Sequence, residues 1–230
     1  TRKQEDFEER LVNKNNKKLF PLFLVLDEPE IHQHPYRQRS LIKKIEALIN
    51  NENFEFVNLL EELFDIDGLT GQIFIATHSP NVLLNDYRQF IRIYKNPENS
   101  NRLEIVSGMD VVIDDKLYKH MLHNFIYLKE AMFSKYIVFV EGDTENGAIP
   151  VFAERMGIDM DEKGVGVIKL DGADSVKRCM ELYKEFGIKS IAIIDKDKKA
   201  NYASEIGIYF TKANDYEEDV YDNFKLKDYL

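Results

Sequence analysis

The feature that most constrains the fold is a series of short apolar runs that alternate with helix-like segments in the second half of the chain. The apolar runs lie in "KYIVFVEGDTE", "GVGVIKLDG", "KSIAIIDKDKK" and "IGIYF", and the helix-like segments between them are "NGAIPVFAERMG" and "DSVKRCMELYKEFG". Apolar runs bounded by turn residues are typical of buried strands. Strands that alternate with helices of this length predict an α/β fold with a parallel sheet.

The first half of the chain predicts a mixed α/β unit. "LFPLFLVLD" and "GQIFIATHSP" are typical of buried strands, and between Tyr36 and Asn50 the apolar residues fall at helical spacing. "FIRIYKN" and "RLEIVSG" flank the turn-rich "PENSN" and predict a hairpin. Residues 1–18 are charged with sparse apolar positions, so we expect a solvated helix or its frayed end.

Residues 108–134 carry a helical stripe of apolar residues and are expected to form a connecting segment. The stripe consists of Leu117, Met121, Leu122, Phe125 and Leu128. The sequence therefore predicts three parts, which are residues 1–107, the helical connector 108–134, and a second α/β domain over 135–230. Because the chain begins at Thr1 within a charged run, we expect it to be part of a longer protein.

Composition limits the classes of function. The 31 Lys and Arg against 41 Asp and Glu give a formal charge of −10, which argues against a surface coated with phosphate-binding cations. A nuclease remains possible, because such an enzyme groups acidic residues at its metal site. The single cysteine, Cys179, excludes an internal disulfide, and no apolar run approaches the length of a membrane span. We expect a cytoplasmic protein that does not contact a membrane.

The first set of candidate site residues is Asp27, Glu28 and His78. Asp27 and Glu28 end an apolar run, where one carboxylate could hold Mg²⁺ through water and the other could orient or deprotonate an attacking water. His78 ends the second strand-like run, where an imidazole could contact a γ-phosphate. Each signal is weak alone, since acids end strands by chance and a lone histidine is usually structural. The phosphate-binding loop G-x-x-x-x-G-K-[ST] does not occur in the sequence.

"FLVLDEP", "EIHQHP" and "ATHSP" resemble the Walker B and switch-histidine motifs of ABC-type ATPases of the chromosome-maintenance and repair kind, in the branch attached to nucleases. The resemblance implies metal binding for Asp27, a catalytic base in Glu28 and a γ-phosphate sensor in His78. It also implies ATP as a cofactor and the C-terminal part of an ABC ATPase head over residues 1–107, with the phosphate loop preceding Thr1. His32 and His34 are expected to pack or to support the site rather than to bind zinc.

The second set of candidate residues is Glu141, Glu145, Asp195 and Asp197. Glu141 closes the run "YIVFVEG", and Asp195 and Asp197 leave the run "SIAIID". The carboxyl ends of parallel strands share one sheet edge, so these acids could converge there. Carboxylate oxygens suit Mg²⁺ or Mn²⁺, and two such ions could clamp a phosphodiester. The alternative is that these acids only end strands and cap helices.

"FSKYIVFVEGDTENGAIPVFAE" together with "DKD" resembles the Toprim domain, and more closely that of the overcoming-lysogenisation-defect (OLD) family. In that family an ABC ATPase precedes a Toprim nuclease with a Rossmann-like sheet, and the Gabija anti-phage subunit is a relative. The resemblance implies metal ligands in Glu141, Asp195 and Asp197, and a ligand or base in Glu145. Glu218 resembles an acidic residue that this family places late in the sequence, beside the second metal. The alternative, that Glu218 only belongs to a solvated acidic turn, remains open.

The resemblance implies an ATP-regulated, divalent-metal-dependent DNA endonuclease that acts in anti-phage defence. DNA, a second copy bound through the ATPase region, and a helicase-like defence protein are the implied partners. The alternative function is a nucleotide-gated DNA-binding or scaffold subunit whose Toprim site is inactive.

Overall fold

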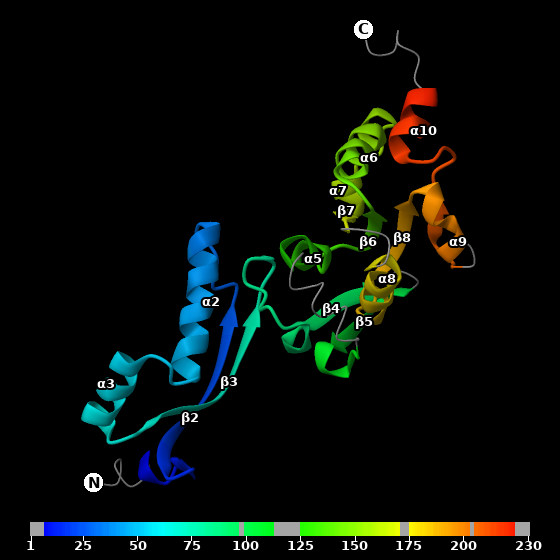
Figure 1. The fold of residues 1–230 in the computed structure, drawn as a ribbon. Coiled ribbons are helices and arrows are strands. Elements are labelled where there is room, and N and C mark those ends of the chain that lie inside the picture. The colour runs from blue at the N-terminus through cyan, green and yellow to red at the C-terminus, as the bar shows by residue number, and fades with distance from the viewer. Residues whose placement is uncertain (1–6, 97–98, 113–124, 171–174, 203–204, 224–230) are drawn as a thin grey trace. The chain divides into compact units, whose positions relative to one another are not determined.

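The computed structural model describes residues 7–96, 99–112, 125–170, 175–202 and 205–223 (Figure 1). The chain divides into two compact units, Thr1–Leu83 and Leu84–Leu230. The α/β fold class is confirmed, whereas the three parts expected from the sequence, with boundaries at 107/108 and 134/135, stay a prediction.

The first unit is a three-stranded sheet with helices α2 (Pro35–Ile49) and α3 (Phe54–Phe64). The strands are ordered β1 (Val12–Lys14), β2 (Lys17–Asp27) and β3 (Gly68–Ala76). β2 and β3 run parallel, and Asp27 lies opposite Ala76 in their register. The loops that follow the two strands therefore start at the same edge of the sheet. The two strands and α2 agree with the sequence prediction.

Of the N-terminal segment expected to form a solvated helix or its frayed end, residues 1–6 lie outside the described residues, residues 7–8 are helical, and residues 12–18 form a hairpin instead. β1 pairs antiparallel with the start of β2, and the turn residues Asn15 (φ 52°) and Asn16 (φ 58°) both adopt the left-handed conformation. Two successive left-handed residues are typical of the type I′ turn of a hairpin, for which asparagine is favoured. For residues 12–18 the prediction was wrong because a short strand with exposed side chains lacks an apolar pattern, and the Asn-Asn pair was the usable signal.

Helix α3 was not predicted from the sequence. Its N-cap is Asn53, whose side chain accepts a hydrogen bond of 3.0 Å from the backbone N–H of Phe56. Leu60 from α3 joins Ile66 and Leu69 in a buried cluster. The asparagine before an apolar run of helical spacing was a helix-start signal.

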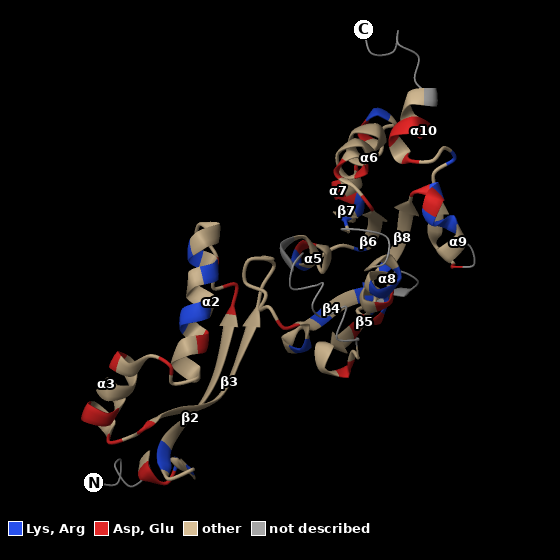
Figure 2. Ribbon diagram, in the orientation of Figure 1, with Lys and Arg blue, Asp and Glu red and all other residues tan. Residues whose placement is uncertain are grey.

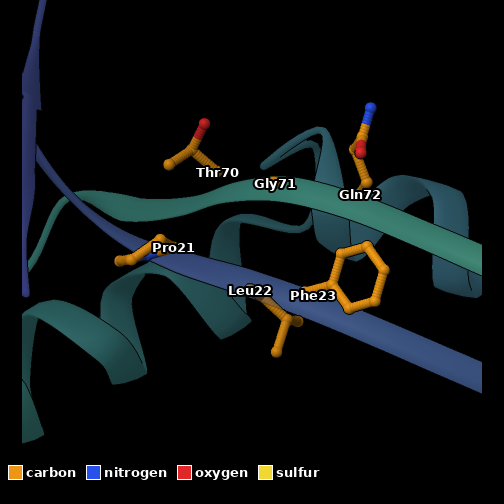
Figure 3. A pocket seen from close by; sticks show the side chains of 6 residues that line it. All are labelled: Pro21, Leu22, Phe23, Thr70, Gly71 and Gln72. Atoms are coloured by element: carbon orange, nitrogen blue, oxygen red, sulfur yellow. The ribbon is translucent and has the colours of Figure 1, made fainter.

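One face of the first unit's sheet exposes large apolar side chains. Phe23 and Val25 on β2 are 68% and 62% exposed, and the ring of Phe23 lies 5.4 Å from that of Phe74 on β3. A hollow of about 370 Å³ on these strands contains no ionisable side chain (Figure 3); its lining is Pro21, Leu22, Phe23, Thr70, Gly71 and Gln72. This hollow therefore offers no side chain for acid–base chemistry.

Gly71 lets β3 approach β2 at the centre of this sheet. Its φ is +142°, and a Cβ at this position would lie 1.8 Å from the carbonyl oxygen of Leu22. Both the conformation and the space require glycine.

The second unit contains a hairpin and a parallel sheet. The hairpin pairs β4 (Ile91–Asn96) with β5 (Asn99–Ser107), as predicted. The sheet has the order β7 (Val165–Lys169), β6 (Tyr136–Val140), β8 (Lys189–Ile194) and β9 (Ile208–Phe210), and every neighbouring pair runs parallel. This arrangement confirms the parallel sheet expected from the alternation of strands and helices.

The described helices of the second unit are α5 (Phe125–Ala131), α6 (Asp143–Arg155), α7 (Met160–Lys163), α8 (Val176–Glu185), α9 (Lys199–Tyr202) and α10 (Tyr216–Asn223), with short 3-10 turns η1 (Tyr87–Gln89), η2 (Gly108–Asp110) and η4 (Lys196–Lys198). α5 agrees with the end of the predicted connector helix, and its remaining stripe at 117–122 lies outside the described residues. In the ranges that the structure describes, no helix is both long and apolar enough to cross a membrane.

The core of the second unit lies between α8 and the sheet. Phe139, Tyr183 and Phe186 are fully buried, and the rings of Phe139 and Tyr183 lie 5.7 Å apart. The buried hydroxyl of Tyr183 donates a 2.7 Å hydrogen bond to the carbonyl of Leu128 on α5. This bond satisfies the only polar atom of the side chain and fixes α5 to α8.

Arg92 fastens the hairpin to the rest of the second unit. Its guanidinium donates hydrogen bonds to the carbonyl oxygens of Met132 (3.0 Å), Ser134 (3.0 Å) and Phe186 (2.7 Å). It also lies 4.6 Å from the centre of the Tyr94 ring. Burial lowers the pKa of Arg92. The planar group satisfies three backbone acceptors at once, which a lysine could not do.

Candidate active sites

The first candidate site lies where β2 and β3 end. The backbone N–H of Glu28 donates a 2.8 Å hydrogen bond to the carbonyl of Ala76, so the parallel pairing continues one residue past β2. Asp27 is exposed at the end of the strand. Ligands of open α/β sheets bind outside the carboxyl ends of the strands. The two predicted acids therefore occupy an edge suited to nucleotide chemistry.

The structure brings Glu28 and His78 together. The distance from His78 Nε2 to Glu28 Oε1 is 3.5 Å, and the histidine side chain is 87% exposed. Glu28 adopts a left-handed backbone conformation with φ 43°. Such a conformation is unfavourable for a non-glycine residue and persists only where surrounding contacts impose it.

His32 and His34 do not pack in the interior. Both residues are exposed, so the expectation that their side chains pack is wrong. His34 is the N-cap of α2 but makes no side-chain capping bond, and the helix begins at the following proline. The fixed φ of that proline suits the first helical position.

Glu30 belongs to "EIHQHP" but was given no role from the sequence, and the structure shows that it is only 7% exposed although it lies in the same loop. Its Oε1 accepts a hydrogen bond from the hydroxyl of Thr77, the residue before His78. Nothing in the local pattern distinguishes this glutamate from its exposed neighbours, because its partner comes from another strand.

The second candidate site lies where β6 and β8 end. Val140 on β6 is paired with Ile193 on β8, so Glu141 and Asp195 follow adjacent parallel strands. The backbone N–H of Asp195 donates a 2.9 Å hydrogen bond to Glu141 Oε1. The structure thus brings together the two acids that the sequence places at neighbouring strand ends.

Glu145 lies in the first turn of α6, and its side chain lies next to Gly142 in the turn that joins β6 to α6. Its side chain is 4% exposed, and a Cβ on Gly142 would lie 2.7 Å from Glu145 Oε2. Burial raises the pKa of Glu145, and the charges of Glu217 and Glu141 raise it further. Gly142 therefore leaves space for a buried carboxylate at this edge.

Asp195 is the most perturbed carboxylate of the site. Burial raises its pKa to about 6, and the charges of Glu141, Glu145, Asp197 and Asp215 contribute in that order. Its Oδ1 is buried and has no hydrogen-bond partner. A buried carboxylate oxygen without a donor is costly, so this atom calls for a partner that the chain itself does not provide.

Asp197 lies on the exposed turn η4. Its Oδ2 accepts a 2.6 Å hydrogen bond from Lys198 Nζ, and it contributes to the raised pKa of Asp195. Lys196 is engaged elsewhere, since its Nζ donates to the carbonyl of Lys212. Figure 2 shows acidic and basic residues interleaved on the segment that follows β8.

Glu218 lies on α10, and its expected place beside a second metal ion stays a prediction. It is exposed, and its Oε2 accepts a 3.2 Å hydrogen bond from the backbone N–H of Asn214. The charge of Asp215 raises the pKa of Asp195, and the charge of Glu217 raises the pKa of Glu145. Glu217 Oε1 also accepts a 2.6 Å hydrogen bond from the hydroxyl of Thr144, close to Glu145 in the sequence.

The carboxylate oxygens of the second site suit a divalent cation, although the side chains do not converge on one point. Within the ranges that the structure describes, no three His, Cys, Asp or Glu side chains converge closely enough to hold a metal ion. Burial and, after it, the neighbouring carboxylates raise the pKa of Asp195, and its Oδ1 is buried without a hydrogen-bond partner, so a bound cation would offset both effects. Mg²⁺ and Mn²⁺ prefer oxygen ligands of this kind.

The strand-end acids of both units lie in segments that match known domain families. Residues 3–83 match the AAA ATPase domain, and residues 132–197 match the Toprim domain of overcoming lysogenization defect protein-like proteins. Together these matches are consistent with an ATPase–Toprim protein of the OLD family, which confirms the family expected from the motifs. No curated protein matches the chain. The Gabija subtype stays a prediction.

Proposed function

We propose that this chain supplies the rear part of an ABC-type ATPase head and the Toprim nuclease site of a DNA endonuclease regulated by ATP. The observation that carries the nuclease proposal is the pair Glu141 and Asp195, joined by a 2.9 Å hydrogen bond at adjacent strand ends, with Asp195 Oδ1 buried and unpartnered. The Toprim match over residues 132–197 includes both acids.

In this proposal Glu141, Asp195 and Asp197 hold Mg²⁺ or Mn²⁺, and Glu145 and Glu218 contribute at a second ion. Bound divalent ions would polarise the scissile phosphodiester and lower the pKa of an attacking water. The backbone N–H of Asp195 fixes the position of the Glu141 carboxylate. Burial makes Glu145 a stronger base than an ordinary glutamate, which suits it to accept a proton from water.

For the ATPase part, we propose that Asp27 binds the nucleotide's metal ion, that Glu28 orients and deprotonates water, and that His78 senses the γ-phosphate. The 3.5 Å separation of Glu28 and His78 supports a shared site. A second copy of the protein would complete this site. DNA as substrate, a helicase-like partner and a role in anti-phage defence follow from the family resemblance.

The test is cleavage of supercoiled plasmid by the full-length protein in Mg²⁺ or Mn²⁺, with and without ATP. We expect nicking or linearisation that disappears in Asp195→Ala/Asp197→Ala. The matched control is Asp161→Ala/Glu162→Ala, which removes the same charge from exposed positions on α7. Cleavage that survives the Asp195/Asp197 substitution would refute the assignment of the nuclease site.

The second candidate function is a nucleotide-gated DNA-binding or scaffold subunit with an inactive Toprim site. It is favoured by the absence of a converged group of three metal-binding side chains among the described residues. Absence of cleavage under all conditions, together with ATP-dependent DNA binding or assembly, would support it over the endonuclease.

A further inference from the structure

Glu30 is a buried acid in the loop that carries the proposed water-activating residue. It follows Glu28 by two positions and is one of three buried polar side chains among the described residues, with Glu145 and Thr211. Its Oε1 accepts a hydrogen bond from the hydroxyl of Thr77, while its Oε2 is buried without a partner. A leucine or methionine would fill such a site without the cost of burying a carboxylate. The presence of an acid therefore calls for a functional reason.

The partner of Glu30 belongs to a hydrogen-bond network between the two loops and α2. The hydroxyl of Thr77 accepts from the backbone N–H of Ser79 (3.0 Å), and Ser79 Oγ donates to Gln38 Oε1 on α2 (2.8 Å). Gln38 Nε2 donates to the carbonyl of Gln33 (2.9 Å), whose own side chain donates to the carbonyl of Pro29 (3.0 Å). The network begins and ends in the loop that follows β2.

This loop holds an unfavourable backbone on both sides of Glu30. Glu28 has φ 43° and His32 has φ 62°. Left-handed conformations of non-glycine residues persist only when surrounding contacts impose them. Backbone hydrogen bonds from Ile31 to Glu28 (3.2 Å) and from Gln33 to Glu30 (3.0 Å) shape the turn. The side chain of Glu30 attaches this turn to the loop that follows β3.

Thr77 and His78 are consecutive, so an anchor on Thr77 also limits where the His78 imidazole can lie. His78 is 87% exposed and its Nε2 has one acidic neighbour within 4 Å in the described residues, Glu28 Oε1 at 3.5 Å. An exposed side chain with so few contacts depends on its backbone for position. The contact between Thr77 and Glu30 supplies that constraint.

We propose that Glu30 is a positioning residue, which acts through the Thr77 hydroxyl to hold His78 opposite Glu28 for ATP hydrolysis. This inference rests on the proposed ATPase function of Glu28 and His78. Glu30 itself contacts neither of the reacting groups. It should therefore affect the turnover of bound ATP rather than the binding of ATP.

The experiment measures ATP hydrolysis and the Kd of a fluorescent ATP analogue for the full-length protein. Glu30→Ala should lower kcat by roughly 10- to 100-fold, the scale of loss when a catalytic group is misplaced by about 1 Å, with Kd changed less than about twofold. Glu30→Gln should retain most of the activity, because its amide oxygen can still accept from Thr77. Thr77→Val should match Glu30→Ala, whereas Thr77→Ser should remain active.

The double variant Glu30→Ala/Thr77→Val tests whether the two residues act together. Its kcat should be no lower than that of either single variant, since partners in one hydrogen bond are not additive. Ile42→Ala on α2 is the control for general destabilisation, because Ile42 is 6% exposed and belongs to no hydrogen bond of the network. It should lower Tm and leave kcat unchanged at temperatures where the protein stays folded.

Three results would overturn the inference while leaving the ATPase proposal intact, and the first two are full kcat in Glu30→Ala and equal losses in Glu30→Gln and Glu30→Ala. A wild-type protein without ATPase activity would refute both proposals. A loss in Glu30→Ala that Ile42→Ala reproduces at equal Tm would reduce Glu30 to a stabilising residue and would also overturn the inference.

Discussion

Replacing Asp195 by asparagine should stabilise the metal-free protein at alkaline pH. The folded protein raises the pKa of Asp195 from 3.8 to about 6. Because the folded-state pKa is the higher one, ionisation of Asp195 opposes folding. The penalty is absent below about pH 4 and is fully present once the pH exceeds the folded-state pKa. An asparagine of the same shape removes the penalty.

The size of the effect follows from the pKa difference. A difference of about two pKa units corresponds to about 3 kcal/mol at most. Asp195 is only partly buried, so solvent screening reduces the expected gain to about 1–2 kcal/mol. Added Mg²⁺ should make the wild-type protein more stable than Asp195→Asn. The cation favours the ionised carboxylate of the wild-type protein, and the variant lacks this ligand.

Hydrogen–deuterium exchange of peptides from β6 and β8, with a chelator present, measures the stability of this sheet by itself. At pH 8 Asp195→Asn should raise protection about 5- to 30-fold, which corresponds to 1–2 kcal/mol. At pH 4 the two proteins should exchange alike. Comparison at equal pH cancels the intrinsic exchange rate. A lower protection at pH 8, or an equal gain at pH 4, would refute the reasoning.

Asp219 provides a control of opposite sign. The backbone N–H groups of Lys212 and Ala213 donate to its carboxylate and lower its pKa. A lowered folded-state pKa means that the ionised form stabilises the fold, and this contribution is lost as the pH falls through that value. Asp219→Asn should therefore reduce stability at pH 8 and have little effect in strong acid.

Three further predictions concern the fold. Arg92→Lys should destabilise the second unit by about 2–4 kcal/mol in urea unfolding, because buried carbonyls lose their donors. The control is Arg102→Ala on the same hairpin, which should cost less than about 0.5 kcal/mol because the Arg102 side chain is 73% exposed. Equal costs in the two variants would contradict the role of Arg92. Gly71→Ala should lower the free energy of unfolding by at least about 2 kcal/mol, because the new Cβ would overlap β2. The control, Gly147→Ala in open space on α6, should raise the free energy of unfolding by about 0.5–1 kcal/mol. A stabilising effect of Gly71→Ala would refute the prediction for Gly71. Burial raises the pKa of the Cys179 thiol to about 12. Cys179 should therefore react with a thiol reagent only after the protein unfolds. Rapid reaction in the native protein would contradict the burial of Cys179.

The strand-end acids could be predicted because two simple patterns coincide. An apolar run fixes a buried strand, and the acid that closes the run must then lie at the sheet edge. Parallel pairing brings Glu141 and Asp195 to the same edge without any further information. The same logic holds for Asp27 and His78, which follow the parallel strands β2 and β3.

The remaining site residues could not be predicted because they depend on how separate elements meet. Successive residues of α10 point about 100° apart, so "NDYEED" does not reveal which acid acts on the site. The charge of Asp215 raises the pKa of Asp195 and the charge of Glu217 raises the pKa of Glu145, whereas the role of Glu218 stays a prediction. Glu30 is buried where its hydrogen-bond partner, Thr77, comes from another loop. No local pattern contains that contact.

The attachment made by Arg92 has a consequence for how this protein can change during evolution. All three of its hydrogen-bond acceptors are main-chain carbonyls, at Met132, Ser134 and Phe186. Every amino acid carries such a carbonyl, so substitutions at these positions leave the acceptors in place as long as the backbone keeps its course. The arginine has no such freedom, because only a guanidinium reaches three acceptors in one plane. Among related chains, drift should therefore be asymmetric, with an arginine that stays fixed opposite partners whose identities vary.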